Sequence, residues 1–220
     1  MRRATPRNPS CMTIKETLPL QDGQSAAAAE AEAARACLAG RSLVLVGLPG
    51  VGKSSVGRRL SQRIGLPFVD ADSEIEKAAG MAISEIFAHR GEPAFRDGEA
   101  KVIARLVSGA PLVIATGGGA FMREDTRQAV AARGVSVWLD ATNDVLLNRI
   151  RKRSHRPLFA KGDPVKTLRN LRTARDPQFA TADLHVRSSS GPHDQVVSAI
   201  IHGLLTHAPF GAPLEQDLEP

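Results

Sequence analysis

The chain has 220 residues, a formal net charge of +6 and two cysteines. This length suffices for one α/β domain with a substantial core and is too short for two large domains, so we expect one active site. Cys11 and Cys37 stand alone without metal-ligand spacing, which excludes a disulfide framework and fits a reducing compartment. No apolar run approaches the roughly 18 to 20 residues of a membrane helix, and no signal-peptide hydrophobic region follows the N-terminal MRRATPRNPS. We therefore expect a cytoplasmic protein that does not bind membranes.

The positive charge is concentrated in one segment. Residues 149–175 hold 10 Lys and Arg against one acid, Asp163, so the segment carries +9 and the remainder of the chain −3. Such a concentration of charge suits either nucleic acid or the phosphates of a small substrate. Nucleic-acid surfaces usually add aromatic side chains that stack on bases, and only Phe159 falls inside this segment. The composition therefore favours a small anionic ligand over nucleic acid.

The two ends of the chain differ in composition from the middle. Residues 1–38 are polar and alanine-rich, and their AAAAEAEAARA stretch can form a helix but lacks the apolar stripe that would dock it firmly. We expect residues 1–38 to be a largely disordered extension in front of one domain, residues 39–206. The Pro-rich end, residues 207–220, has little to bury and is expected to be a flexible tail.

From Ser42 onward, short apolar runs alternate with helical patterns. The run LVLV leads through a glycine-rich turn into a helix predicted over 53–64, with Val56, Leu60 and Ile64 on one face. Further strands are predicted at residues 66–69, 112–115, 135–139 and 184–186. Strands that alternate with helices predict an α/β fold with a parallel sheet covered on both faces.

Local signals mark two helix starts and one loop. Asp163 before Pro164 predicts an N-cap followed by proline at the first helical position, and Thr142 or Asn143 could cap the helix that ends near Arg149. The charged stretch 151–162 has no periodicity and is expected to be a mobile surface loop.

Residues 47–54, GLPGVGKS, match the P-loop pattern between a predicted strand and a predicted helix. The glycines let backbone N–H groups turn toward phosphates, and the helix start adds a partial positive charge. Lys53 is expected to reach the β and γ phosphates of ATP, and the Ser54 hydroxyl to ligate Mg²⁺. A turn that only solved a packing problem would not need both Lys53 and Ser54, so the motif predicts a nucleotide site.

Two carboxylates follow the second predicted strand in the sequence Val69-Asp70-Ala71-Asp72, at the sheet edge where open α/β folds bind ligands. One acid could help to hold Mg²⁺ through water, and the other could accept a proton from an attacking hydroxyl or orient it. Equally, Asp72 or Ser73 could simply cap the following helix. The residues alone leave both functions open.

Three glycines, Gly117, Gly118 and Gly119, directly follow the predicted strand PLVIAT. They remove all side chains from the surface that faces the cleft, although a flexible turn would use the same residues. Arg96 lies in the helical segment EPAFRDGEA and, taken alone, is an ordinary surface arginine.

Taken in order, the segments GLPGVGKSS, VDADSEIE, IFAHRGEPAFRDGE, VIATGGG, RPLF and ARDPQFATAD resemble the shikimate kinase family over about residues 41–201. Other P-loop kinases share the first motif but not the combination. The resemblance implies a P-loop NTPase fold of the nucleoside monophosphate kinase-like type, with a five-stranded parallel sheet flanked by helices and a mobile lid at about residues 151–163. It also implies a monomeric enzyme that phosphorylates the 3-hydroxyl of shikimate with ATP and Mg²⁺, in the shikimate pathway of aromatic amino acid biosynthesis.

The same resemblance implies the site residues. The expected ATP-binding residues are Gly50, Val51, Gly52, Lys53, Ser54, Ser55, Arg149 and Arg156. The expected shikimate-binding residues are Asp72, Arg96, Gly117, Gly118, Gly119 and Arg175, with Glu99 as the acid that orients Arg96. The metal would be held by Ser54 and Asp70, and the catalytic groups would be Lys53, Asp72 and Arg156.

The chain departs from the family pattern at two positions: Phe159, where Leu is common, and Phe179, where Tyr is common. These changes affect lid packing and one hydroxyl hydrogen bond, and they remove no proposed catalytic group.

Three alternatives remain. A gluconate kinase-like enzyme should lack the carboxylate-binding arginines, a nucleic-acid-binding ATPase would use the +9 segment on phosphates, and an inactive regulatory relative should have lost Lys53 or an acid.

Overall fold

The computed structural model describes residues 22–151, 163–188, 191–208 and 210. A five-stranded parallel sheet in the order β2-β3-β1-β4-β5 forms the centre of the molecule, which confirms the predicted α/β fold. The strands are β1 (Ser42–Val46), β2 (Phe68–Asp70), β3 (Val113–Ala115), β4 (Gly134–Ala141) and β5 (Leu184–Ser188).

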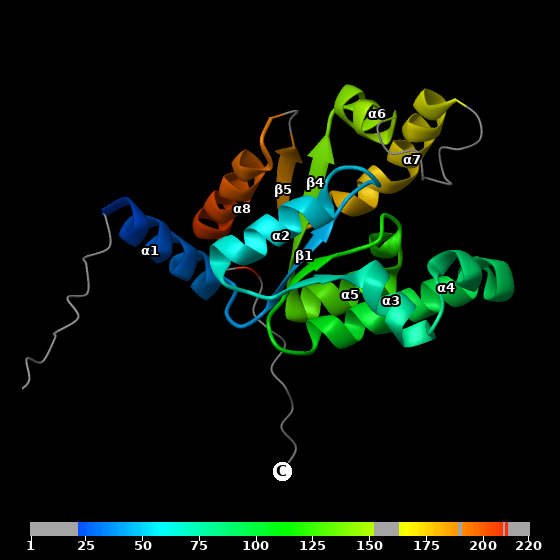
Figure 1. Cartoon of the computed structure of the whole chain (residues 1–220), viewed down its shortest axis with the longest axis horizontal. Helices are drawn as coiled ribbons and strands as arrows, with labels where there is room; N and C mark the ends of the chain where they lie inside the picture. The colour runs from blue at the N-terminus through cyan, green and yellow to red at the C-terminus, as the bar shows by residue number, and fades with distance from the viewer. Residues whose placement is uncertain (1–21, 152–162, 189–190, 209, 211–220) are drawn as a thin grey trace, which may run out of the picture.

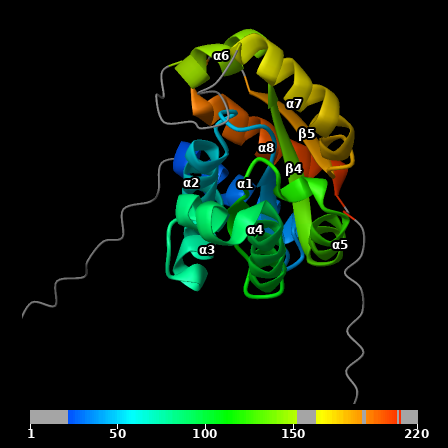
Figure 2. The ribbon, with the colours of Figure 1, turned by 90° about the vertical axis from the view of Figure 1, so that its right-hand side faces the viewer.

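Helices cover both faces of the sheet. They are α1 (Asp22–Cys37), α2 (Lys53–Ile64), α3 (Ala71–Ala79), α4 (Ile83–Val107), α5 (Glu124–Arg133), α6 (Asn143–Arg151), α7 (Pro164–Phe179) and α8 (His193–His207), with a 3₁₀ turn, η1 (Ala120–Met122). Helices α1, α2 and α8 pack together on one face, and α5 packs against β4 on the other (Figure 1). Helices α6 and α7 lie at the end toward which β4 and β5 point, as both views show (Figure 2). Within the described ranges, no helix is long and apolar enough to cross a membrane.

Strand β1 is the central strand, and its five residues are all buried. Val44 aligns with Ile114 of β3 on one side and with Ser136 of β4 on the other. An apolar strand buried on both faces is the pattern expected of a parallel sheet. The carboxyl end of β1 therefore lies between two other strand ends, where a ligand site can draw on all three.

Helix α4 consists of two helical parts. Gly91 has a φ of 77°, outside helical geometry, and Pro93 follows within the first turn of the second part. Proline at a helix start needs no backbone donor, so the second part begins there and carries Arg96. Val102 and Ile103 anchor this part in the interior.

Most predicted elements are confirmed, with shifts of a few residues at strand ends. The helix over 53–64 has the predicted bounds. The Asp163 side chain caps α7 by accepting a hydrogen bond from the Val165 N–H at 2.9 Å, and Thr142 Oγ1 accepts from the Val145 N–H at 3.5 Å at the start of α6. Phe179 is fully buried and stacks on Phe121 and Trp138, so a phenyl ring suits this position.

Helix α1 corrects the expectation of an undocked, largely disordered extension over residues 1–38. Ala34 and Leu38 are 0% and 1% exposed and belong to the main core. Glu30 also accepts a salt bridge from Arg63 of α2 at 3.2 Å. A broad apolar stripe is unnecessary because small alanines let the helix approach its neighbours closely. Residues 1–21 lie outside the described residues.

The expected tail, residues 207–220, also needs a correction at its start. Phe210 is 7% exposed and packs on the main core, and its carbonyl accepts a hydrogen bond from Arg41 at 3.3 Å. Residues 211–220 lie outside the described residues.

Substitution of Ala34 tests whether α1 is part of the folded unit. Ala34→Asp places a carboxylate in the core, and we expect it to lower the free energy of unfolding by about 3 kcal/mol or more. Ala33→Asp, at the neighbouring exposed position, is the matched control and should change it by no more than about 0.5 kcal/mol. Urea denaturation measures both, and equal values for the two variants would show that α1 does not dock.

Candidate functional site

The phosphate loop connects β1 to α2 at the carboxyl edge of the sheet. Gly50 and Gly52 have φ values of 96° and 108°, which side chains rarely allow, so glycine is required for the loop to close on itself. Gly52 is followed at once by the first turn of α2, which contains Lys53, Ser54 and Ser55. The N–H groups at this helix start point toward the loop, where an anion can bind.

Lys53 crosses the phosphate loop from its base. Its ammonium donates to the carbonyl oxygens of Gly47 at 2.7 Å and Leu48 at 3.1 Å, and the residue is 8% exposed. These contacts hold the positive charge inside the loop. A polyphosphate seated there would therefore meet the ammonium without a long movement of the side chain.

Asp70 joins the phosphate loop to α3. Its Oδ2 accepts a hydrogen bond from Ser54 Oγ at 2.7 Å, and its Oδ1 accepts from the Asp72 N–H at 3.2 Å. The N-cap of α3 is therefore Asp70, and the alternative with Asp72 or Ser73 as the cap is wrong. The Asp72 side chain does not cap the helix and can therefore interact with a ligand in the cleft.

Asp72 is a partly buried carboxyl group with charges of both signs around it. Burial is the main cause that raises its pKa, and the negative charge of Asp70 adds to this effect. The positive charges of Lys53 and Arg96 act in the opposite direction. A carboxylate with a raised pKa holds a proton more readily than an exposed one, which suits a group that accepts a proton from a hydroxyl.

The three glycines after β3 are needed because other groups approach their backbone closely. A Cβ on Gly117 would stand 2.5 Å from Glu99 Oε1 and 3.0 Å from Asp72 Oδ1. A Cβ on Gly118 would stand 2.7 Å from the Pro49 ring, and one on Gly119 would stand 2.9 Å from the Arg96 guanidinium. A side chain at Gly118 would meet the rigid Pro49 ring, and one at Gly117 or Gly119 would displace the Glu99 carboxylate or the Arg96 guanidinium, so the glycines do more than form a flexible turn.

Arg96 is held by two acids of its own helix. Its guanidinium donates to Glu99 Oε2 at 2.6 Å and to Glu92 Oε1 at 3.2 Å. Glu99 is 1% exposed, and burial raises its pKa while the Arg96 contact lowers it. Its Oε1 accepts no hydrogen bond from the described residues. These contacts agree with the expected role of Glu99 in orienting Arg96.

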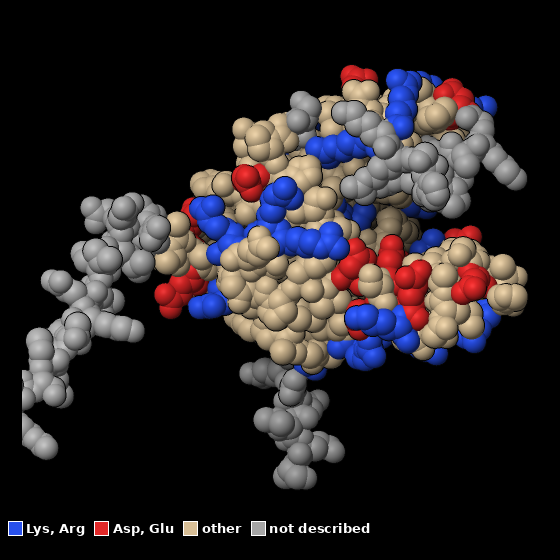
Figure 3. Space-filling view, in the orientation of Figure 1, with Lys and Arg blue, Asp and Glu red and all other residues tan. Residues whose placement is uncertain are grey.

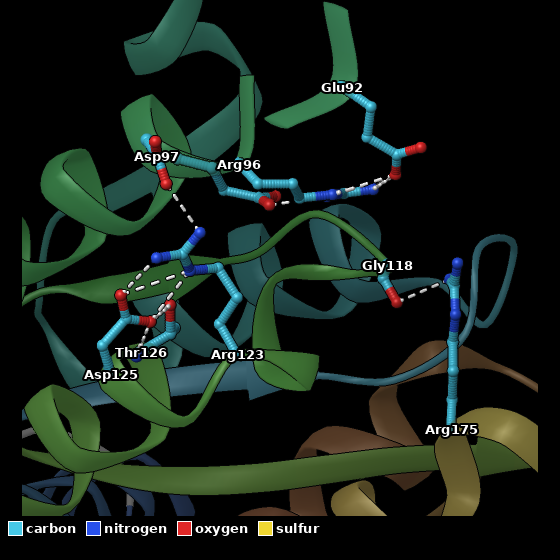
Figure 4. Close-up of polar contacts among 9 residues, drawn as sticks. Glu92, Arg96, Asp97, Gly118, Arg123, Asp125, Thr126 and Arg175 are labelled. Atoms are coloured by element: carbon cyan, nitrogen blue, oxygen red, sulfur yellow. Dashed lines mark hydrogen bonds and ion pairs between the residues drawn. The ribbon is translucent and has the colours of Figure 1, made fainter. Parts of the chain in front are cut away.

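Arg175 of α7 reaches the same loop from the opposite side. It donates to the Gly118 carbonyl at 2.9 Å, and Figure 4 shows Arg96 and Arg175 on either side of the loop. Burial and the nearby charge of Arg96 lower the Arg175 pKa. Two arginines held beside each other favour an anion between them, since their mutual repulsion is relieved when a carboxylate binds.

Arg123 lies near this pair and has a structural role. It donates to Asp97, the neighbour of Arg96, at 2.7 Å and to Asp125 at 2.6 Å (Figure 4). These contacts join α4 to the start of α5. They fix the backbone from which Arg96 projects.

Arg149 of α6 contacts the phosphate loop from the side of β4. It donates to the Val51 carbonyl at 2.7 Å and to Ser188 Oγ at 3.2 Å, and burial lowers its pKa. The predicted loop residues and Arg149 are thus brought together. Arg156 and Phe159 lie outside the described residues.

Sequence reasoning missed three contributors to the site: Pro49, Glu92 and Ser188. Glu92 had a signal, since it precedes Arg96 by four residues on a helix and such pairs contact each other. Pro49 and Ser188 contact residues remote in sequence, and no local pattern indicates that.

The surface is hollowed between the parts of the molecule that carry these groups. In Figure 3, Lys and Arg side chains lie on the side of α2, α6 and α7, and acidic side chains gather on the side of α3 and α4. The described residues thus combine a polyphosphate loop, a carboxylate at its edge and an arginine pair opposite. This arrangement suits transfer of a phosphoryl group to a small acceptor that carries a negative charge.

Comparisons with known proteins identify the family and the fold. The family model described as shikimate kinase matches residues 49–205. A shikimate kinase of Bradyrhizobium diazoefficiens is 56% identical over 170 residues, which cover 77% of this chain and 82% of that protein. One of Rhodopseudomonas palustris is 48% identical over 200 residues, which cover 89% and 97%.

Solved structures extend the comparison. The shikimate kinase of Acinetobacter baumannii in complex with shikimate aligns with a TM-score of 0.74 at 33% identity, covering 80% of this chain and 99% of that chain. A gluconokinase of Sinorhizobium meliloti aligns with a TM-score of 0.52 at 20% identity, covering 74% and 90%, a likeness in fold alone.

Replacing Glu99 by Gln tests the buried carboxyl group. Its folded-state pKa is raised above the ordinary 4.5, so between these two pKa values the folded state binds more protons than the unfolded state. The contribution of Glu99 to the stability of the native protein should therefore fall as pH rises from 4.5 through the raised pKa. Gln does not titrate, so the Tm of Glu99→Gln should improve relative to the native Tm across that window.

Thermal unfolding followed by circular dichroism, from about pH 4 to about pH 8, measures this difference. Lys101→Gln on the same helix, at an exposed position, controls for a general loss of charge. A Tm difference that does not vary with pH would contradict the assignment of a raised pKa to Glu99.

Proposed function

The chain belongs to the shikimate kinase family, and from that premise we infer that it is a shikimate kinase, which transfers the γ-phosphoryl group of ATP to the 3-hydroxyl of shikimate. The observation that carries the proposal is the position of Arg96 at Gly119 and of Arg175 at the Gly118 carbonyl, next to Pro49 of the phosphate loop. A P-loop alone identifies a nucleotide site. The arginine pair adds a place for the carboxylate of the acceptor.

We propose that the phosphate loop binds ATP through its backbone N–H groups, with Lys53 stabilising the charge of the transferring phosphoryl group. Gly50, Val51, Gly52, Ser54 and Ser55 form the rest of this binding site. Arg149 would border the nucleotide, because it contacts the loop at Val51. The lid arginine, Arg156, is proposed to add positive charge on closure.

The residues around Ser54 fit a magnesium ion. The Ser54 hydroxyl and the Asp70 carboxylate are hard oxygen donors held 2.7 Å apart, and Mg²⁺ prefers such ligands together with waters and phosphates. Ser54 and Asp70 would hold the ion when nucleotide is bound. The ion would neutralise charge on the phosphates.

On the acceptor side, Arg96 and Arg175 are proposed to bind the shikimate carboxylate as planar forks. The backbone of Gly117, Gly118 and Gly119 would border the ring, and Asp72 would orient the 3-hydroxyl. In the transfer step the hydroxyl O–H bond breaks, an O–P bond forms and the bond between the γ-phosphorus and the ADP oxygen breaks. The proton would pass to Asp72, whose raised pKa supports that role.

The alternatives have less support. The gluconokinase likeness is one of fold alone, at 20% identity, whereas the family model and relatives at about 50% identity are shikimate kinases. An inactive regulatory relative would have no need to retain both Lys53 and Asp72. A cytoplasmic location and a monomeric state remain predictions from the sequence.

Release of ADP over a panel of acceptors tests the proposal. The panel contains shikimate, quinate, gluconate and nucleoside monophosphates, each measured with and without Mg²⁺. We expect ADP release to depend on both shikimate and Mg²⁺, because the site activates a bound hydroxyl and excludes water. Equal release with and without shikimate would rule out the proposed acceptor.

Two substitutions separate binding of the acceptor from chemistry. Asp72→Asn keeps the shape of the side chain and removes its basicity, so we expect kcat to fall by about 10²-fold or more. Arg96→Lys loses the planar fork that binds the carboxylate in ground and transition states alike, so it should mainly raise the KM for shikimate. Steady-state kinetics at several concentrations of both substrates distinguish the two patterns. Native kcat in a folded Asp72→Asn protein would remove Asp72 from the catalytic groups.

A further inference from the structure

Arg172, on α7, makes an unusually large set of polar contacts outside the cleft. Its Nε donates to Asn143 Oδ1 at 2.6 Å and its Nη1 to Asp176 Oδ2 at 3.1 Å. Its Nη2 donates to Asp140 Oδ1 at 3.0 Å and to the carbonyl of Ala141. One guanidinium thus binds the end of β4, the start of α6 and its own helix.

Each of the two helices that Arg172 joins carries a site arginine. Helix α6 begins at Asn143 and carries Arg149 beside the phosphate loop, and α7 carries Arg175 beside Gly118. Arg172 and Arg175 are three residues apart and are therefore neighbours on the helix surface. Any rotation or shift of α7 that released Arg172 would also move Arg175.

The contacts of Arg172 with Asp140, Ala141 and Asp176 are partly buried, whereas its contact with Asn143 lies at the surface. The side chains of Arg172 and Asp140 are 19% and 10% exposed, so solvent screens this ion pair less than a surface pair. Charge-assisted hydrogen bonds to several acceptors also fix the direction of a guanidinium more narrowly than one bond does. Arg172 therefore holds the end of β4, the start of α6 and the helix α7 in a defined position relative to one another.

We propose that Arg172 is a positioning residue for phosphoryl transfer, which holds α6 and α7 in the register that places Arg149 and Arg175 at the site. The proposal rests on the proposed function, since it concerns the arginines assigned there to nucleotide and acceptor. Arg172 touches neither substrate in this scheme. It acts through the backbone of the two helices.

Nearby charges provide a matched control. Asp140 Oδ2 also lies 3.7 Å from Arg187 Nε and 3.8 Å from His185 Nε2, both on the edge strand β5. The Arg187 side chain is 70% exposed. Arg187→Ala removes an arginine from the same carboxylate without releasing α6 or α7.

The main test compares Arg172→Ala, Arg172→Lys and Arg187→Ala by steady-state kinetics with ATP and shikimate. A displacement of about 1 Å in a binding group can cost up to about 10²-fold, so we expect Arg172→Ala to lower kcat/KM for shikimate by at least about tenfold, mainly through KM. Lysine keeps a charge near Asp140 but cannot reach all the acceptors, so Arg172→Lys should recover only part of the loss. Arg187→Ala should stay within about twofold of the native enzyme.

A second variant, Asn143→Ala, removes only the contact with α6 and leaves the bonds of Arg172 to β4 and α7. It should raise the KM for ATP by more than the KM for shikimate, a pattern that a general loss of stability would not produce. Tm values measured for all four variants identify any that fail to fold.

The outcomes separate this proposal from the proposed function. If the native enzyme and Arg187→Ala phosphorylate shikimate while folded Arg172→Ala and Arg172→Lys keep native KM and kcat values, Arg172 has a structural role only and the proposal is wrong. Should Arg172→Ala not fold, native kinetics in Arg172→Lys together with Asn143→Ala would overturn it equally. If the native enzyme itself releases no ADP with shikimate, the proposed function fails first.

Discussion

The site depends on how closely charged side chains approach the backbone of Gly117, Gly118 and Gly119. Asp72 of α3 and Glu99 and Arg96 of α4 meet the loop at distances that a side chain on the loop would disturb, and Arg175 of α7 binds its backbone at the Gly118 carbonyl. Side chains that are remote from one another in the sequence thus converge on the segment 117–119, which has no side chains of its own. A single methyl group there would push a carboxylate, a proline ring or a guanidinium out of place.

Because these side chains converge, buried carboxyl groups and arginines lie next to one another and partly offset each other's charge. Buried carboxyl groups and arginines are costly unless they are paired, and here the two kinds lie next to each other. Arg96 offsets part of the cost of burying Glu99, while the pKa of Asp72 stays raised because burial and Asp70 outweigh the nearby positive charges. The same pairing that stabilises the fold therefore leaves one carboxyl group with altered acidity at the cleft.

Helices and strands with strong local patterns were predicted from the sequence. Features that depend on packing between distant segments were not. The α2 helix and the phosphate loop follow from periodicity and spacing, and the strands of the sheet follow from short apolar runs. The helical tendency of α1 was predicted but its docking was not, because Ala34 and Leu38 are too few to form a visible apolar stripe. The sequence left open whether Asp72 caps α3, and the structure shows that Asp70 is the cap, with its other carboxylate oxygen bound by Ser54. Contacts such as those of Pro49 with Gly118 join distant segments and have no local signal.

The order of the strands also bears on how the protein is made. Strand β1 is synthesised before its two partners in the sheet, β3 and β4, which begin at Val113 and Gly134. The segments that close the core, α8 and Phe210, come last, and Phe210 is bound by Arg41 just before β1. A nascent chain on the ribosome therefore contains the complete phosphate-loop sequence before the strands and helices that surround the loop have been synthesised. Pairing of the central strand joins segments far apart in the sequence, and such non-local pairing is expected to slow folding.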